Sequence, residues 1–181
     1  MNKKKLFNVL IFVLFSSIIL TSFKKDNIEP PITTNDIVES FRLETGINAI
    51  FVVDTSLLNT VVSWQGQGDY PGVDDWATVK FPDNFDLLGG LPGQSEYYTI
   101  NQSIIDADTI QVDYWESLQV KALPVIGYRP MVGVFDLTDT IVVVISKTLA
   151  NNQYGDGGAW QIYVANFNED LICIDTIYLK Q

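Results

Sequence analysis

The sequence predicts an α+β fold, a β-rich antiparallel or mixed sheet with one or two short helices. Short apolar segments rich in β-branched residues are separated by turn residues and outnumber the helical patterns along the 181-residue chain. The helical patterns are too few and too scattered for the repeated crossovers of a parallel sheet. An all-β sandwich is the alternative, because several short strands between turns suit that fold too. One helical segment, Thr33 to Glu44, decides for α+β.

That helix has a recognisable start, face and end. Asn35 or Asp36 can cap it, Gly46 falls where a helix would stop, and the apolar residues that share one face are Ile37, Val38 and Phe41. A further helical turn is expected over 146–150, while 115–122 fits either state. The expected strands are 49–53, 60–64, 77–81, 97–100, 110–114, 131–137, 140–145, 159–165 and 171–179. Segment 66–75 is expected to be a loop rich in Gly, Asp and Pro, and segment 82–93 is expected to be rich in turns.

The N-terminus has the pattern of an export signal. Three lysines, Lys3 to Lys5, precede an apolar run from Leu6 to Leu20, which is shorter than the roughly 20 residues of a membrane span. We expect cleavage near Ser22 and a secreted or periplasmic protein, with an uncleaved membrane anchor as the alternative. The predicted organisation is a signal peptide over 1–22, a linker over 23–32 and one globular domain over 33–181.

Charge and composition exclude several classes of function. Cleavage near Ser22 leaves eight basic against 22 acidic residues, so we expect no nucleic-acid partner and no membrane partner for the mature chain. Cys173 is the only cysteine, which rules out an intramolecular disulfide. The chain has no histidine, which removes Ser-His-Asp and Cys-His catalysis and histidine-bearing zinc sites.

A metal site would therefore need oxygen ligands. Two aspartate clusters are available, but neither has the spacing of an EF-hand loop, and a solvated acidic loop is the expected state of both. The clusters are Asp106, Asp108 and Asp113, and Asp69, Asp74 and Asp75. We predict no metal and no cofactor.

The segment from Tyr154 to Val164 is the strongest candidate for a functional site. Its adjacent glycines, Gly157 and Gly158, allow close approach of the backbone to a ligand. The apolar strand after them would hold Gln161 in fixed geometry.

Four segments, in order, resemble stretches of secreted NAD-degrading toxin domains related to tuberculosis necrotizing toxin, within the wider ADP-ribosyltransferase-like fold. They are 81–90 (FPDNFDLLGG), 120–124 (VKALP), 127–130 (GYRP) and 154–161 (YGDGGAWQ). The resemblance implies an exported NAD-glycohydrolase or ADP-ribosyltransferase-like effector, with NAD as substrate and an immunity-type protein as partner.

The resemblance also implies roles for individual residues. Gln161 takes the place of a functional glutamine, but Lys121 stands where the family has an arginine before a Leu-Pro pair, and Arg129 is the only arginine nearby. Both an active and an inactive domain are compatible with these departures. The candidate catalytic residues are Gln161 and Arg129, and the candidate substrate-binding residues are Lys121, Tyr128, Tyr97, Tyr98, Gly157, Gly158 and Trp160.

The chemistry of NAD cleavage explains these choices. Loss of nicotinamide passes through a ribosyl cation, so a site must fix the ribose hydroxyls, hold the diphosphate and leave room for water. Gln161 can hydrogen-bond a hydroxyl, and the planar fork of Arg129 suits a phosphate better than Lys121 does. Aromatic side chains such as Trp160 can stack on a ring.

Two other functions remain open. A noncatalytic extracytoplasmic domain that binds carbohydrate or protein fits the missing histidine, the few cations and the aromatics Trp64, Tyr70 and Trp76 of a Gly-rich segment. A glycosidase would need two converging carboxylates, for which Glu96 and Glu116 are candidates.

Overall fold

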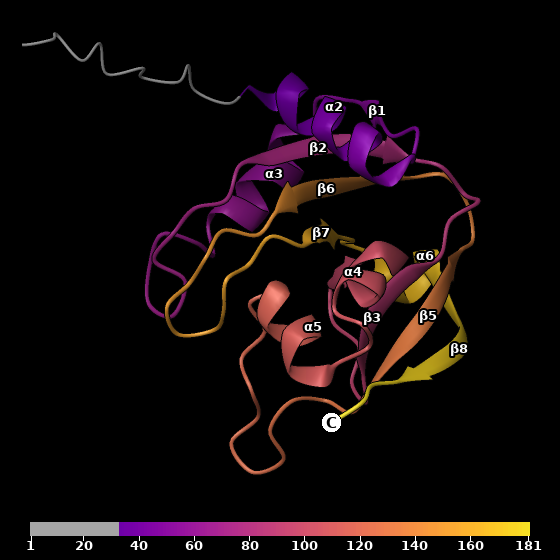
Figure 1. Ribbon diagram of the computed structural model, residues 1–181. Helices are drawn as coiled ribbons and strands as arrows, with labels where there is room; N and C mark the ends of the chain where they lie inside the picture. The colour runs from indigo at the N-terminus through magenta and orange to yellow at the C-terminus, as the bar shows by residue number, and fades with distance from the viewer. Residues whose placement is uncertain (1–32) are drawn as a thin grey trace, which may run out of the picture. The chain divides into compact units, whose positions relative to one another are not determined.

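The computed structural model describes residues 33–181 (Figure 1). The expected signal peptide, its cleavage site and the linker lie outside the described residues. Within residues 33–181 no helix has the length and apolar character needed to cross a membrane.

The chain builds an eight-stranded antiparallel sheet with short helices, which confirms the α+β fold class. The strand order is β1-β2-β6-β7-β4-β3-β5-β8, and the sheet is open, with β1 and β8 as its edges. The elements in chain order are α2 (Thr34–Thr45), β1 (Ile50–Phe51), α3 (Thr55–Val62), β2 (Trp76–Phe81), β3 (Leu87–Leu91), β4 (Tyr97–Thr99), α4 (Asn101–Asp106), α5 (Gln111–Ser117), β5 (Met131–Leu137), β6 (Ile141–Lys147), β7 (Trp160–Tyr163), α6 (Phe167–Asp170) and β8 (Leu171–Tyr178).

The main core lies between α2 and one face of the sheet. Helix α2 buries Ile37, Val38 and Phe41, and the Phe41 ring meets the Trp160 indole edge-on with 5.0 Å between ring centroids. Seven strands, from β2 to β8 across the sheet, contribute side chains to this one cluster. Burial of apolar side chains from strands across the sheet therefore stabilises the fold.

Helices α3, α4 and α5 pack on the other face of the sheet. A small cluster around Val61 of α3 includes Trp76, Val144 and Tyr163, whereas α4 and α5 pack against β3 and β5. In Figure 1, α3 lies beside β2 and β6, apart from α5, which lies below β7. Alternation along β7 puts Trp160 in the main core and Gln161 on the face that carries α3 and α5.

The first predicted helix is confirmed, with a different cap. Thr33 is the N-cap and forms a capping box with Asp36, in which each side chain accepts from the other residue's backbone N–H. Gly46 ends the helix in the left-handed conformation at φ +72°, as its position predicted. Strands are also present within the predicted ranges 49–53, 97–100, 131–137, 159–165 and 171–179, while β2 and β6 differ from their predicted bounds by one or two residues.

Four local predictions were wrong, and one helix was missed. Segment 60–64 is not a strand, because helix α3 runs into it. Asp54 starts this helix by accepting a hydrogen bond from Leu57 N at 2.9 Å. The β-branched residues at the end of the helix favour a strand in sequence-based prediction. Segment 110–114 is largely helix α5, and 146–150 is not helical. Strand β3 crosses segment 82–93, which was expected to be rich in turns, because its glycines allow close packing of neighbouring side chains and do not form a turn. Helix α4 was not predicted.

Candidate functional site

A cavity of about 290 Å³ opens on the face of the sheet that carries α3 and α5. Its wall is built from the loop after α3, from β3 and β4, from the end of α5 and from single residues before β5, after β6 and on β7. Both candidate catalytic residues, Arg129 and Gln161, lie in this wall although they are far apart in the sequence. The sheet order brings both residues to one wall, with β4 and β3 between β7, which carries Gln161, and β5, which follows Arg129.

A buried carboxylate organises one part of the wall. Asp74 is only 7% exposed, and its Oδ2 accepts hydrogen bonds from Gln65 Nε2 at 2.7 Å and Gln161 Nε2 at 2.6 Å. Its Oδ1 accepts from the backbone N–H of Leu149 at 2.8 Å. Three neutral donors thus satisfy a carboxylate that has no basic partner among the described residues.

This network fixes the orientation of the Gln161 amide. A carboxylate only accepts hydrogen bonds, so the Nε2 group of Gln161 must face Asp74 and its Oε1 is left to accept from elsewhere. Gln65 is itself held, because its Oε1 accepts from Asp74 N at 2.8 Å and from Trp76 Nε1 at 2.9 Å. Gln161 is therefore presented as a hydrogen-bond acceptor.

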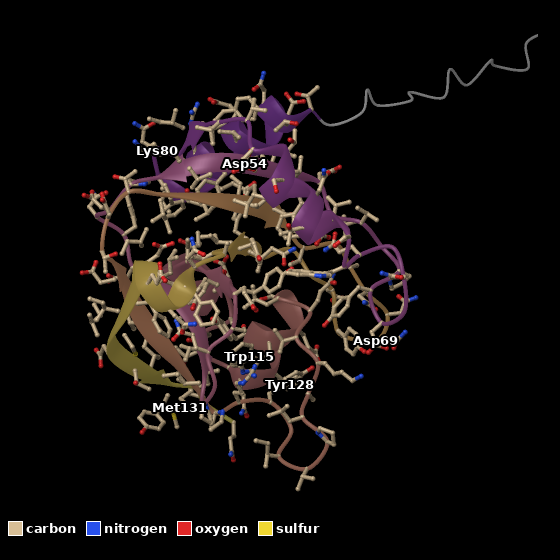
Figure 2. All side chains as sticks on the ribbon, turned by 180° about the vertical axis from the view of Figure 1, so that it is seen from behind. Asp54, Asp69, Lys80, Trp115, Tyr128 and Met131 are labelled. Atoms are coloured by element: carbon tan, nitrogen blue, oxygen red, sulfur yellow. The ribbon has the colours of Figure 1, made fainter. Side chains whose placement is uncertain are left out.

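Arg129 is a half-buried cation with an anchored backbone. Its carbonyl oxygen accepts a hydrogen bond from Trp115 Nε1 at 2.7 Å, and Pro130 follows it directly. Trp115 lies on helix α5, where Figure 2 labels it. Gly90 makes room for the guanidinium, because a Cβ there would lie 3.2 Å from both Cδ and an Nη atom of Arg129.

Aromatic rings form another part of the wall. Trp64 lies edge-on to Tyr97 with 6.2 Å between ring centroids, and Tyr97 in turn packs on Tyr163 at 5.5 Å. Burial raises the pKa of the Tyr97 hydroxyl, and burial also raises the pKa of Tyr98 to about 12. Both phenols are therefore neutral near pH 7, and both tyrosines line the cavity.

The glycine-rich turn packs against protein rather than lining the cavity. A Cβ at Gly157 would lie 2.5 Å from the Leu149 carbonyl oxygen, and one at Gly155 would lie 2.5 Å from the Glu116 carbonyl oxygen. Gly157 and Gly158 both have positive φ, and neither is in the cavity wall. The glycines thus allow the turn to pack against the end of α5 and to deliver β7, with Gln161, to the site.

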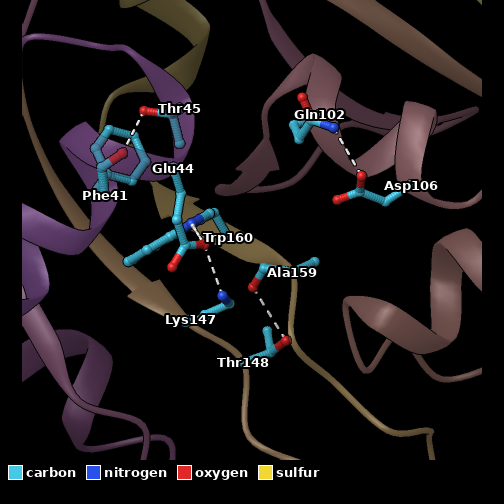
Figure 3. A network of polar contacts seen from close by, with 9 residues as sticks. All are labelled: Phe41, Glu44, Thr45, Gln102, Asp106, Lys147, Thr148, Ala159 and Trp160. Atoms are coloured by element: carbon cyan, nitrogen blue, oxygen red, sulfur yellow. Dashed lines mark hydrogen bonds and ion pairs between the residues drawn. The ribbon is translucent and has the colours of Figure 1, made fainter.

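The other sequence candidates lie outside the wall. Lys121 is exposed and pairs with Asp69 at 2.8 Å, and the Tyr128 hydroxyl contacts Glu116 Oε1 at 3.4 Å. Trp160 is buried in the main core, where its Nε1 donates to Glu44 Oε2 at 3.0 Å (Figure 3). Lys147 donates to the same oxygen at 2.7 Å. Trp160 therefore lies on the opposite face of β7 from Gln161.

The structure also shows where the candidate residues of the carbohydrate-binding, glycosidase and metal-binding alternatives lie. Trp64 and Tyr70 line the cavity, whereas Trp76 is buried with its indole nitrogen bonded to Gln65. Glu96 and Glu116 are both outside the cavity wall. Among residues 33–181 no group of three or more acidic or cysteine side chains is arranged to hold a metal ion, the two aspartate clusters included.

Sequence reasoning missed several residues of the wall. For Asp74 the sequence predicts only a solvated acidic loop, because nothing local distinguishes it from exposed Asp75. Tyr114 and Trp115 fall at the boundary of the strand predicted over 110–114, but they lie on helix α5. Gln119 has a left-handed backbone at φ +56°, for which the sequence offers no signal.

Comparison with known proteins identifies the class of protein. A family model described as the Rhs1 C-terminal toxin domain matches residues 53–166, which is more than half of the chain and includes the cavity wall described above. The chain belongs to this family of toxin domains. A search of curated protein sequences finds no match.

A solved structure supports the same assignment. The structure described as "Rhs1-CT in complex with cognate immunity protein RhsI1" is 26% identical to this chain with a TM-score of 0.67, and the match covers 71% of this chain and 100% of that chain. These two comparisons confirm the expectation that the chain is a toxin domain. The family that matches is the Rhs1 family, not specifically the NAD-degrading family related to tuberculosis necrotizing toxin.

Proposed function

We propose that this toxin domain binds NAD in the cavity and hydrolyses the bond between nicotinamide and ribose. The observation that carries the proposal is the presence of Arg129 and Gln161 in one cavity wall, with the Gln161 amide oriented by Asp74. The cavity volume of about 290 Å³ lies just below the roughly 300–1,000 Å³ of small-molecule sites, so it would enclose only the reacting part of a dinucleotide.

Four side chains of the wall each have a part in this reaction. Gln161 Oε1 accepts a hydrogen bond from a ribose hydroxyl and so fixes the sugar. The Arg129 guanidinium binds a phosphate oxygen, and Tyr97 and Trp64 supply rings against which the nicotinamide packs.

The bond changes balance without any further reactant. The oxygen of a water molecule bonds to C1′ of the ribose while the C1′–N bond breaks. The electron pair of that bond goes to the ring nitrogen, which neutralises its positive charge, and the water loses a proton to solvent. The products are ADP-ribose, nicotinamide and a proton.

The test is release of nicotinamide from NAD by the purified chain. We expect turnover by the wild type, and a loss of roughly 2 to 4 kcal/mol of transition-state stabilisation in Gln161→Ala. Gln67→Ala, an exposed glutamine outside the cavity wall, is the matched control and should retain full turnover. A wild-type chain that binds a glycan at millimolar concentration and neither binds nor cleaves NAD would instead support the noncatalytic binding function.

The second part of the proposal is that the partner of this chain is an immunity-type protein. The similar solved structure supports it, because its description is of a complex with a cognate immunity protein. The surface that fits such a partner is the loop Leu123–Gly127, which precedes Arg129. Two backbone hydrogen bonds of 2.9 and 3.0 Å close this loop, and they leave Val125 94% and Ile126 63% exposed. Such apolar exposure is typical of an interaction surface.

The test needs an immunity-type protein, and the candidate is the product of a gene that neighbours the gene for this chain. Val125→Asp should weaken the complex, because it would place a charge in an apolar contact. Val53→Asp, at an exposed valine on a different segment, is the control. Equal binding by wild type and Val125→Asp would remove the loop from the interface.

A further inference from the structure

Three buried side-chain polar atoms have no hydrogen-bond partner among the described residues. They are Tyr114 Oη, Gln119 Nε2 and Arg129 Nε. All three residues line the same cavity. An unpartnered buried donor typically costs the fold about 1–3 kcal/mol, so three of them around one cavity are unexpected unless the cavity binds something that accepts hydrogen bonds.

The donors come from rigid parts of the fold. Tyr114 lies on α5, is fully buried and packs edge-on against Trp115 with 4.7 Å between ring centroids. Burial raises the pKa of the Tyr114 hydroxyl, which keeps the group protonated as a donor. Gln119 is 9% exposed, and its backbone N–H is bonded to the Glu116 carbonyl oxygen at 3.1 Å.

Arg129 differs from the other cations of residues 33–181. Four of the six basic residues pair with a carboxylate: Arg42 with Glu39, Lys121 with Asp69, Lys147 with Glu44 and Lys180 with Asp108. The two without such a pair are Lys80, which is exposed, and Arg129, which is half-buried in the cavity wall. In so acidic a chain, a half-buried guanidinium without a carboxylate points to an anion as its partner.

We propose that Tyr114, Gln119 and Arg129 together form a binding site for a phosphoryl group of the ligand. All three are hydrogen-bond donors, and a phosphoryl group offers acceptor oxygens in several directions. The planar guanidinium matches phosphate geometry. This inference rests on the proposed function, in which the phosphoryl group is part of the diphosphate of NAD, and it assigns Tyr114 and Gln119 to substrate binding.

The test compares stability with affinity in the full chain. Tyr114→Phe and Gln119→Met each remove a donor and retain most of the side-chain volume. Because these donors have no protein partner, the substitutions break no hydrogen bond within the fold, and we expect an unchanged or higher melting temperature. We expect calorimetry to show about tenfold weaker binding of ADP-ribose and of inorganic pyrophosphate, the loss typical of one hydrogen bond to a charged group. Binding of adenosine, which has no phosphate, should not change between the variants.

Gln111→Met is the matched control. Gln111 Nε2 already donates to the Tyr128 carbonyl oxygen at 2.8 Å and lies outside the cavity wall, so the variant should lose stability and keep its affinity for ADP-ribose. The inference is overturned if Tyr114→Phe and Gln119→Met bind ADP-ribose as the wild type does, or if the wild type binds neither ADP-ribose nor pyrophosphate at millimolar concentration. A chain that binds both phosphates through these donors but releases no nicotinamide would overturn the proposed function and leave this inference standing.

Discussion

Gln161 Nε2 lies 2.6 Å from Asp74 Oδ2, and this hydrogen bond joins a residue of a central strand to a buried carboxylate 87 positions earlier in the chain. The bond determines which end of the Gln161 amide is available to a ligand. Asp74 thus acts on the site through Gln161, as a positioning residue.

Asp74→Asn should reverse the orientation of the Gln161 amide. The Leu149 N–H would hold the asparagine carbonyl oxygen at the position of Oδ1. The new NH₂ group would then take the place of Oδ2 and face the amide nitrogens of Gln65 and Gln161. Gln65 cannot turn without losing two other hydrogen bonds, so Gln161 would turn and present a donor. We expect nicotinamide release to fall about a hundredfold, and stability to fall by about 1–3 kcal/mol, because donors then face each other.

Asp75→Asn is the control, since Asp75 is the exposed neighbour and carries the same charge. It should leave turnover and melting temperature at wild-type values. Wild-type turnover by Asp74→Asn would show that the amide orientation of Gln161 is irrelevant to the reaction.

Trp160→Phe distinguishes a core residue from a substrate-binding one. The indole packs on Phe41 and donates to Glu44 Oε2, on the face of the sheet away from the cavity. Loss of that hydrogen bond should lower stability by about 1 kcal/mol, given that the glutamate is partly exposed. The Michaelis constant for NAD should not change, and a large increase in it would place the indole at the substrate after all.

The fold class could be predicted because it depends on patterns that are local. Gly46 marked the end of α2, and the alternating segment 131–137 marked β5. The errors occurred where tertiary contacts override propensity. Val61 and Val62 have high strand propensity, yet they end helix α3, which is started by Asp54 and held by packing of Val61 against the sheet.

The site could be predicted only in part, for a similar reason. Gln161 followed a recognisable glycine-rich turn, and Arg129 was the nearest arginine to a resembling segment. Asp74, Tyr114 and Gln119 join them through the sheet order and the docking of α5, which are long-range features without a local sequence signal. Burial without a partner, the property that distinguishes Tyr114 and Gln119, exists only in the folded chain.

Gly90→Val should displace Arg129 from the cavity wall. A Cβ at this position would lie 3.2 Å from the Arg129 side chain and 3.4 Å from the Trp115 ring, and the two methyl groups of valine would need still more room. We expect affinity for ADP-ribose to fall about tenfold or more, as for loss of one charged contact. Gly72→Val, where a Cβ would meet only Leu149 at 3.8 Å, is the comparison and should bind normally. Equal loss of affinity in both variants would argue against a role for the position of Arg129.

The capping box of α2 should make stability depend on pH in the acid range. The Thr33 hydroxyl donates to Asp36 Oδ2 at 2.7 Å and the Thr33 backbone N–H donates to it at 2.8 Å, and these bonds hold the pKa of Asp36 below its usual value. Because the folded pKa is lower than the value of about 3.9 in the unfolded chain, the stabilisation is fully present above that pH. It is lost as the pH falls through the lower, folded value. Asp36→Asn should therefore lower the urea midpoint near neutral pH and match the wild type in strong acid. Asp83→Asn removes an exposed carboxylate elsewhere and serves as the control. A constant difference in midpoint between wild type and Asp36→Asn at every pH would show that the carboxylate of Asp36 contributes no charge-dependent stability.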